Sequence, residues 1–501
     1  MDEQRKLENG QDDEQESQAS EHGRAYPPGG PPVPSTGTDR AAQPGVDEGR
    51  SAPGRPSRGR PPQQGDTPPR PTTRSRKMEQ TYFRKGFGLK AEVKPLIDAE
   101  YHSALVEQIR SRGYTHTFGD VTVELAQQFG FCYGVDRAVD YAYETVRKFP
   151  DRKIFLVGEI IHNPHVNQRM TEMGIEFVYP DDAGGFDFGH VTPDDVVILP
   201  AFGVTLEDFE RLKEIGCVLV DTTCGSVLVV WKRVDQYTRD GFTAVIHGKY
   251  RHEESRATAS QVNKQPGGRY IIVRDMEEVE LICDYVAARP GALSREAFQE
   301  HFREKASPGF DPDVDLRKVG MANQTTMLAG ESMMIGTKIR DAMRERFGDE
   351  YAESNYRAFD TLCSATQERQ DAVAAMMEDP PHVMIVVGGY NSSNTNHLAH
   401  LCSKHTRTFH IDDATKIDVE TGTIRHKPDL GAHQPEVVEE EWLPDGPFRL
   451  GITAGASTPN NKIGEALVRI LRIRGIELEE EPPPAGPGQT TEGEARATAP
   501  T

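Results

Sequence analysis

The sequence of 501 residues lacks any long apolar run. No stretch approaches the roughly 18 apolar residues that a membrane-spanning helix needs. The first residues, MDEQRKLENGQDDEQ, contain neither the apolar segment of a secretory signal nor the arginines of a transit peptide. We therefore expect a cytoplasmic protein that does not enter a membrane.

Positive charge is also scarce. The chain has 58 Lys and Arg residues against 79 Asp and Glu residues, which gives a net charge of −21. Nucleic-acid phosphates and anionic lipid surfaces repel such a chain, so we expect neither as a partner. The six cysteines lack the closely spaced set that a disulfide framework or a zinc site requires.

Both ends of the chain are poor in apolar residues. Residues 1–80 are dominated by Pro, Gly, Gln, Arg and acidic residues, as in YPPGGPPVPSTG, and residues 478–501 have a similar composition. Such segments cannot bury enough apolar surface to offset the loss of chain entropy. We expect both to be disordered tails.

Between the tails, short β-rich runs alternate with helical patterns. The runs are KIFLVGEII, DVVILPAFG, CVLVDTT, FTAVIHG, RYIIV, HVMIVVGG and FRLGITAG. This alternation predicts an α/β protein with mostly parallel sheets. Two stretches interrupt it: residues 289–317 are predicted to form a peripheral helix with loops, and residues 412–446 a long acidic loop.

Cys132, Cys224 and Cys363 share a sequence context. Each follows an extended run and directly precedes a helical pattern, as in FGFCYGVDRA, DTTCGSVLVV and DTLCSATQER. If three βαβ units pack around a pseudo-threefold axis, these strand ends converge. Three thiolates at one point suit an iron–sulfur cluster with one iron left open, and the alternative is that they are buried small apolar residues.

The other three cysteines are predicted to be apolar strand or helix positions. They are Cys217, Cys283 and Cys402, in EIGCVLVD, ELICDYV and HLCSKH. Free cysteine often packs as a small hydrophobic residue, so no metal role is expected for them.

Two polar segments each follow a buried strand and open a helix. Ser392, Ser393 and Asn394 lie in GGYNSSNTNHL, and Ser457 and Thr458 lie in GITAGASTPNNKI. Such residues often cap helices. They also suit an anion site, because helix N-termini present free N–H groups to phosphate. Both interpretations remain open from the sequence.

Further polar residues follow other strands. His162 and His252 could donate to phosphate or serve as structural hydrogen-bonding groups, and Gln324 and Thr325 form another polar strand end. Glu254 could deliver protons or be an ordinary first-turn glutamate.

The motifs occur in an order that resembles a known family. FCYGVDRA, IHNPHV, DTTC, HGKYRHEE, NQTT, DTLCSATQERQ, VVGGYNSSNT and GITAGASTP resemble hydroxymethylbutenyl diphosphate reductases, the LytB family, over roughly residues 121–475. Each motif is weak alone, but eight in order with three cysteines are highly specific.

The resemblance implies a fold and an activity. The fold is three βαβ-type domains in a pseudo-threefold trefoil around a central [4Fe–4S] cluster. The reaction is the reductive dehydroxylation of (E)-4-hydroxy-3-methylbut-2-enyl diphosphate to isopentenyl and dimethylallyl diphosphate. It is the last step of the non-mevalonate isoprenoid pathway, and ferredoxin or flavodoxin would donate the electrons.

The resemblance also implies roles for individual residues. The cluster ligands would be Cys132, Cys224 and Cys363, and Glu254 with Thr325 would relay protons. The residues that would bind the diphosphate are His162, His252, Thr325, Ser392, Ser393, Asn394 and Ser457. Gln324 and Thr366 match nearby polar positions.

One position departs from many bacterial members of the family. Phe202, in PAFGVT, stands where those members carry a further diphosphate-binding histidine, and this departure is similar to the plant and cyanobacterial branch. One phosphate contact is therefore missing or is supplied by another group, for which His165 and Lys249 are candidates.

We expect three folded units within the chain. They are residues 81–224 with Cys132, residues 225–358 including the interruption, and residues 359–477 with Cys363. Two alternatives are a [4Fe–4S] hydro-lyase, which would need a carboxylate-binding arginine set, and a cluster-bearing sensor, in which the polar substrate motifs would have decayed.

Overall fold

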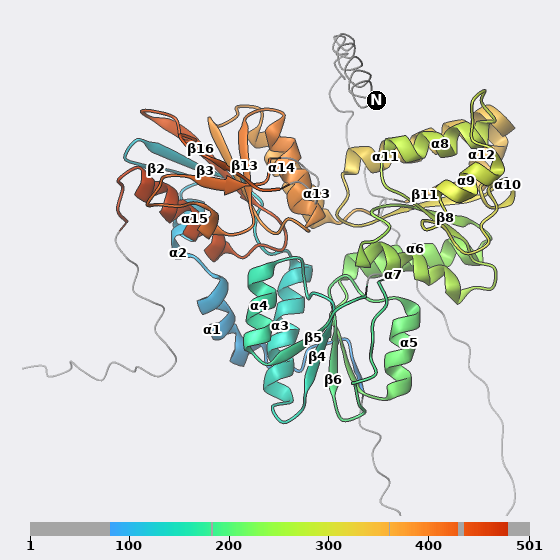
Figure 1. Ribbon diagram of the computed structural model, residues 1–501, viewed down its shortest axis with the longest axis horizontal. Helices are drawn as coiled ribbons and strands as arrows, with labels where there is room; N and C mark the ends of the chain where they lie inside the picture. Colours follow the sequence, from blue (N-terminus) through green and yellow to red (C-terminus); the bar gives the residue numbers. More distant parts are fainter. Residues whose placement is uncertain (1–80, 182–183, 360, 429–434, 479–501) are drawn as a thin grey trace, which may run out of the picture. The chain divides into compact units, whose positions relative to one another are not determined.

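The computed structural model describes residues 81–478 except 182–183, 360 and 429–434 (Figure 1). All of these residues belong to one compact unit. The expected disordered tails, apart from Leu478, lie outside the described residues. No helix in the described ranges is long and apolar enough to cross a membrane.

The first sheet is entirely parallel, with strand order β1-β7-β6-β4-β5. Its central strands are buried along their whole length, as continuous apolar runs such as IFLV and VVIL require. The strands are β1 (Tyr82–Phe83), β4 (Ile154–Val157), β5 (Ile175–Val178), β6 (Val196–Leu199) and β7 (Val218–Asp221), and the nearby helices are α1 (Lys90–Tyr101), α3 (Tyr133–Lys148), α4 (Pro164–Glu172) and α5 (Leu206–Ile215).

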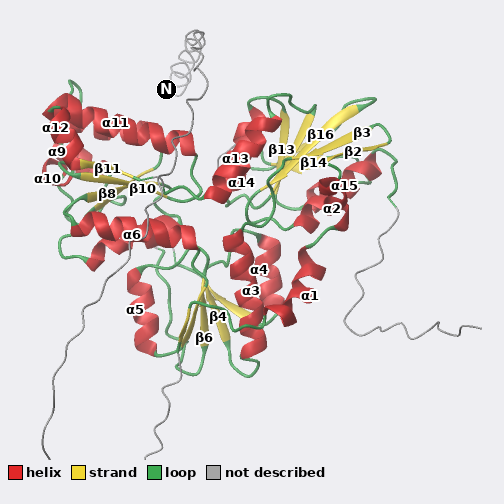
Figure 2. Cartoon of the chain, turned by 180° about the vertical axis from the view of Figure 1, so that it is seen from behind, coloured by secondary structure: helices red, strands yellow, loops and turns green. Residues whose placement is uncertain are grey.

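The second sheet is also parallel, with order β11-β10-β8-β9. Helices α6 and α7 cover one face, and α8 and α11 cover the other (Figures 1 and 2). The strands are β8 (Thr243–His247), β9 (Tyr270–Val273), β10 (Val319–Asn323) and β11 (Tyr356–Ala358). The helices are α6 (Gly225–Arg239), α7 (Glu253–Ser260), the short η1 (Gln261–Lys264), α8 (Met276–Ala287), α9 (Arg295–His301), α10 (Pro312–Asp315), α11 (Ala329–Phe347) and α12 (Asp349–Asn355).

The third sheet has order β13-β12-β16-β3-β2 and is parallel except for the β2–β3 hairpin. The strands are β2 (Thr115–Phe118), β3 (Val121–Leu125), β12 (Val383–Val387), β13 (Arg407–Ile411) and β16 (Phe448–Ala454). The helices are α2 (Ala104–Ser111), α13 (Ser364–Met376), α14 (Ser393–Ser403), the short η2 (Ala414–Lys416) and α15 (Asn460–Ile473).

These sheets confirm the prediction of an α/β protein with mostly parallel sheets. Sheet membership does not follow chain order, because the β2–β3 hairpin lies in the first expected unit but joins the third sheet through the pairing of β3 with β16, which follows Cys363. The domain boundaries stay a prediction.

One of the two interrupting stretches agrees with the prediction, and the other contains more regular structure than predicted. Residues 289–317 contain the short helices α9 and α10, in agreement with the prediction. The stretch expected to be a loop contains an antiparallel pair, β14 (Ile424–His426) and β15 (Val437–Glu439). Trp442 is fully buried in the core of the third sheet, and this apolar anchor explains why the stretch packs onto the sheet.

Candidate active site

Each of the three predicted cluster cysteines is the N-cap residue of a helix. Cys132 precedes α3, Cys224 precedes α6 and Cys363 precedes α13. The strands before them are β3, β7 and β11, which belong to three different sheets. The carboxyl ends of parallel strands are where ligands of α/β proteins gather, so the topology supplies one thiol from each sheet.

Contacts among these cysteines show that the three segments meet. A Cβ atom added at Gly134 would lie 2.5 Å from the Cys224 Sγ and 3.8 Å from the Cys132 Sγ. The Ser226 hydroxyl donates to the Cys363 Sγ at 3.4 Å. Burial raises the pKa of the Cys132 thiol and that of the Cys224 thiol, and neighbouring cysteines add to both shifts. Position 134 therefore accommodates only glycine, because the Cys224 sulfur lies where a larger residue would place its Cβ atom.

Arg369 lies beside the cysteines and was not predicted from the sequence. It is 3% exposed, and its guanidinium donates to the carbonyls of Gly130 and Ala365, both at 2.7 Å. Its Nε has no hydrogen-bond partner among the described residues. Burial lowers its pKa, whereas Cys132 and Cys363 act in the opposite direction. Arg369 is six residues after Cys363 in the sequence, and this spacing does not indicate that its side chain lies beside the cysteines.

The remaining cysteines lie in apolar cores, as predicted. Cys217 packs in a core of the first sheet and Cys283 in the core of the second, and Cys402, on α14, packs against α13 and β12. Burial raises the pKa of all three thiols. These apolar surroundings are those of small hydrophobic residues, as expected for the three positions.

Glu254 is a buried carboxyl group connected to the cysteine segments. It is 1% exposed in the first turn of α7, and its Oε1 accepts the backbone N–H of Thr325 at 2.6 Å. The Thr325 carbonyl in turn accepts the N–H of Cys363 at 3.4 Å. Burial raises the pKa of Glu254 to about 7, although the Thr325 hydrogen bonds and His162 oppose the shift. At neutral pH this carboxyl group therefore carries a proton for about half of the time.

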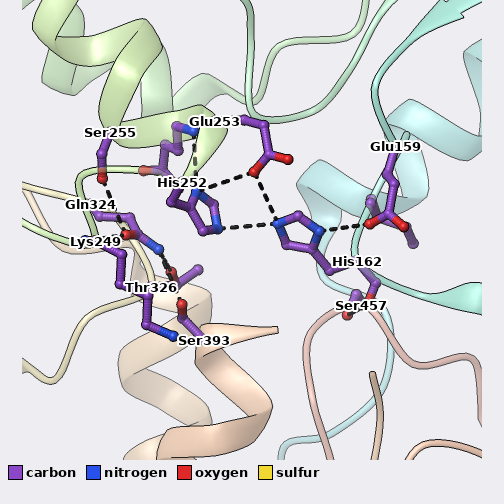
Figure 3. A network of polar contacts seen from close by, with 12 residues as sticks. Glu159, His162, Lys249, His252, Glu253, Ser255, Gln324, Thr326, Ser393 and Ser457 are labelled. Carbon is purple, nitrogen blue, oxygen red and sulfur yellow. Dashed lines mark hydrogen bonds and ion pairs between the residues drawn. The ribbon is translucent and has the colours of Figure 1, made fainter. Parts of the chain in front are cut away.

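His162 and His252 form a hydrogen-bonded pair whose tautomers can be assigned (Figure 3). The His252 Nδ1 accepts the Glu254 N–H at 3.1 Å, so neutral His252 has its proton on Nε2. That Nε2 lies 3.1 Å from the His162 Nε2, which must accept. His162 then holds its proton on Nδ1 and donates to Glu159 at 2.8 Å.

These tautomers bear on a second interpretation of the pair. His162, His252 and Glu253 have ligand atoms within 4.8 Å of one another, as a metal site requires. The His252 Nε2 carries a proton, however, and the His252 Nδ1, which lies 3.8 Å from Glu253, already accepts the Glu254 N–H. In this arrangement the pair therefore offers no vacant ring nitrogen to a cation.

Phe202 packs directly against both histidines. Its ring stacks on His162 with centroids 4.3 Å apart and meets His252 edge-on at 5.5 Å. This contact fixes the orientation of the His162 ring. The Phe202 ring supplies no hydrogen bond, so it acts on the two histidines through packing alone.

The N-terminus of α14 combines capping with free donors. The Ser392 hydroxyl accepts the Thr395 N–H at 3.3 Å, which is a capping role. The Asn394 Oδ1 accepts the Ala456 N–H at 3.0 Å, and its Nδ2 is buried with no partner in the described part of the chain. Ser457 donates to the His162 carbonyl at 3.3 Å. Two helix starts and the histidine pair are thus joined into one polar region.

Gln324 connects this region to the β8–α7 loop. Its Oε1 accepts from the Lys249 backbone N–H at 3.1 Å and from the Ser255 hydroxyl at 3.2 Å (Figure 3). Its Nε2 donates to Thr326 at 2.8 Å and to Ser393 at 3.2 Å. All of its hydrogen-bonding capacity on these atoms is used, so Gln324 positions its neighbours.

Two other residues singled out in the sequence hydrogen-bond to backbone carbonyls and so hold local structure in place. Thr366 is buried in the first turn of α13, where its N–H donates to the Cys363 carbonyl at 2.9 Å. Thr458 donates its hydroxyl to the Val387 carbonyl at 3.0 Å, which ties its loop to β12. Sequence reasoning assigned no role to Glu159 and Glu253, although both lie in segments quoted above, KIFLVGEII and HGKYRHEE.

The fold and the site define a class of protein: an α/β protein in which three sheets each supply one cysteine beside a buried polar region. A family model described as LytB protein matches residues 123–471, and the chain belongs to this family. The resemblance inferred from the motifs is thereby confirmed.

Similar proteins carry a consistent name. The chain is 46% identical to 4-hydroxy-3-methylbut-2-enyl diphosphate reductase of Thermosynechococcus vestitus, over 80% of this chain and 97% of that protein. It is 47% identical to the reductase of Gloeobacter violaceus, over 80% of this chain and 94% of that protein. Both organisms belong to the cyanobacterial branch to which Phe202 pointed.

Two solved structures are also similar. One is a structure of (E)-4-hydroxy-3-methyl-but-2-enyl diphosphate reductase with 28% identity and a TM-score of 0.43, covering 70% of this chain and 98% of its own. The other is the E-1-hydroxy-2-methyl-but-2-enyl-4-diphosphate reductase of Plasmodium falciparum, with 20% identity and a TM-score of 0.50, covering 69% of this chain and 86% of its own. The second likeness concerns the fold alone.

Proposed function

We propose that the protein reduces (E)-4-hydroxy-3-methylbut-2-enyl diphosphate to isopentenyl and dimethylallyl diphosphate, the last step of the non-mevalonate pathway. The C–O bond of the allylic alcohol breaks, two electrons and two protons are taken up, and the oxygen leaves as water. The observation that carries this proposal is the chain from Glu254 through Thr325 to Cys363, in a member of the LytB family.

Cys132, Cys224 and Cys363 would hold a [4Fe–4S] cluster, arranged as the centre of a pseudo-threefold trefoil. Three thiol ligands, three helix N-termini and the buried Arg369 guanidinium suit an anionic group of this kind. When bound, the cluster supplies electrons and one iron that no protein ligand occupies. The protein's own side chains would bind, orient and protonate the substrate.

Glu254 is the group that would hold the proton for the reaction. Its raised pKa keeps a share of the carboxyl protonated at neutral pH, and burial keeps that proton from exchanging freely with bulk water. Thr325 hydrogen-bonds the Glu254 carboxyl group through both its N–H and its side chain, and these bonds would hold the acid in place.

The polar region would bind the diphosphate and so position the allylic carbon. The Asn394 Nδ2, which has no acceptor among the described residues, is a donor in this region, and the His252 Nε2–H would exchange its bond to His162 for one to the diphosphate. The N-terminus of α14 would stabilise the negative charge of the bound diphosphate. The residues proposed to bind it are His162, His252, Thr325, Ser392, Ser393, Asn394 and Ser457.

Ferredoxin or flavodoxin is proposed as the electron donor, in a cytoplasmic setting. The [4Fe–4S] hydro-lyase and the sensor are not favoured, because the similar proteins with high coverage are named reductases. In the described part of the chain the arginine beside the cysteines, Arg369, is bound to backbone carbonyls rather than open to a substrate carboxylate.

The test is anaerobic turnover by the purified, cluster-loaded protein. Reduced methyl viologen supplies electrons, and its colour is followed on addition of hydroxymethylbutenyl diphosphate. We expect substrate-dependent bleaching and both five-carbon diphosphates as products. No bleaching, with the cluster intact by spectroscopy, would overturn the proposed activity.

A further inference from the structure

Lys249 lies at the polar region and has no partner for its charge among the residues that the structure describes. It is in the loop between β8 and α7, it is partly buried, and its backbone N–H is held by Gln324. Figure 3 shows the side chain extending past Gln324 toward the N-terminus of α14, where Ser393 lies. No hydrogen bond or ion pair joins its ammonium group to any residue in the described ranges.

The groups that act electrostatically on Lys249 do not neutralise it. Lys427 lies near enough to lower the pKa of Lys249, in addition to the larger effect of burial. Lys249 in turn helps to lower the pKa of His252 and of His397, and burial is the main cause of both shifts. An ammonium group placed among a second lysine and two neutral histidines needs an anion.

An independent observation shows where that anion would bind. The Asn394 Nδ2 is a donor in a side chain that is 2% exposed, yet it has no acceptor among the described residues. It belongs to the first turn of α14, a helix of 11 residues, toward whose N-terminus Lys249 extends. A buried donor without an acceptor costs free energy unless a ligand supplies one.

His165, the other candidate for the missing contact, has different surroundings. Its ring meets Tyr101 edge-on at 6.1 Å, and its charged neighbours are Lys462, Glu465, Asp413 and Glu172. These groups lie outside the hydrogen-bond network that joins His162, Gln324 and Ser393.

We propose that Lys249 binds the diphosphate of the substrate and supplies the contact that Phe202 cannot make. This inference rests on the proposed function. Lysine acts as a compact point charge, so it can replace a histidine donor without matching its geometry. Lys249 is therefore a substrate-binding residue whose loss raises KM more than it lowers kcat.

The first test measures binding of inorganic pyrophosphate to the cluster-loaded full-length protein by calorimetry. Lys249→Met should weaken binding by about 10- to 100-fold, as loss of a charge-assisted hydrogen bond does. Lys249→Arg keeps the charge and should retain most of the affinity. The matched control is Lys404→Met, which removes a lysine at the opposite end of α14. Unchanged affinity in Lys249→Met would overturn the proposal.

A second measurement needs no variant of Lys249. Surface acetylation of the wild-type chain, followed by mass spectrometry, should label Lys249 less when pyrophosphate is bound, and Lys404 equally in both states. Binding without protection of Lys249 would overturn the proposal even if Lys249→Met does not fold. Failure of wild-type turnover with intact pyrophosphate binding would instead reject the proposed reaction.

Discussion

A single buried carboxyl group sets the pH behaviour expected of this protein. Glu254 lies at a position where its charge is disfavoured, with a pKa raised by burial to about 7. A proton donor must be protonated to act, so turnover should fall as the pH rises through about 7.

Replacing this carboxyl group should separate chemistry from binding. Glu254→Gln cannot donate a proton, and we expect a loss of turnover of at least about 100-fold, with the cluster and pyrophosphate affinity retained. Steady-state kinetics with methyl viologen would measure the loss. The control is Glu277→Gln, an exposed first-turn glutamate on α8. Near-normal turnover in Glu254→Gln would remove this residue from the mechanism.

The same residue predicts a dependence of stability on pH. Its usual pKa of 4.5 in the unfolded chain rises to about 7 on folding. Between these values the folded state holds a proton that the unfolded state has lost, so the free energy of unfolding falls as pH rises, by about 3 kcal/mol in all. The stabilisation that comes from this bound proton is fully present below pH 4.5 and is lost above about pH 7.

Denaturant unfolding of the wild type and of Glu254→Gln across this pH range would check the sign. The variant has no titrating group at position 254. The stability of Glu254→Gln relative to the wild type should therefore increase as the pH rises. A difference that is constant with pH would contradict the raised pKa.

At the scale of the elements, each cluster cysteine is also a helix cap. Serine is a good N-cap residue, so Cys132→Ser, Cys224→Ser and Cys363→Ser should keep α3, α6 and α13 while removing a thiolate. We expect each variant to fold and to lose its iron and sulfide. Analysis of metal and acid-labile sulfide would measure this.

The matched controls are the three cysteines in apolar cores. Cys217→Ser, Cys283→Ser and Cys402→Ser should lower stability, because a hydroxyl is buried where a thiol packed, but should keep the cluster. A variant of this second group that loses iron while remaining folded would refute the ligand assignment.

The elements also show what local pattern can predict. Continuous apolar runs such as HVMIVVGG were found as buried parallel strands, and the DTTC and DTLC segments do start helices. The pairing of β3 with β16 was not predictable, because it joins residues more than 300 positions apart. The place of Arg369 and the hydrogen bonds of Gln324 depend on that tertiary pairing, which no local signal encodes.

At the scale of the whole molecule, every proposed site residue lies between Cys132 and Ser457. Removal of residues 1–80 should therefore leave turnover and the melting temperature within experimental error of the full chain. Parallel assays and thermal melts of the two proteins would measure both. A shortened protein that folds but does not turn over would show a role for the removed segment.

The separation of the three cysteines along the chain has a consequence for biosynthesis. Cys132, Cys224 and Cys363 follow strands of three different sheets, and the third lies 231 residues after the first. A nascent chain cannot assemble this ligand set until translation has passed Cys363 and strands from each sheet have paired. Insertion of the proposed cluster would therefore be a late event, and retained iron would report that a newly made chain has been translated past Cys363 and has folded.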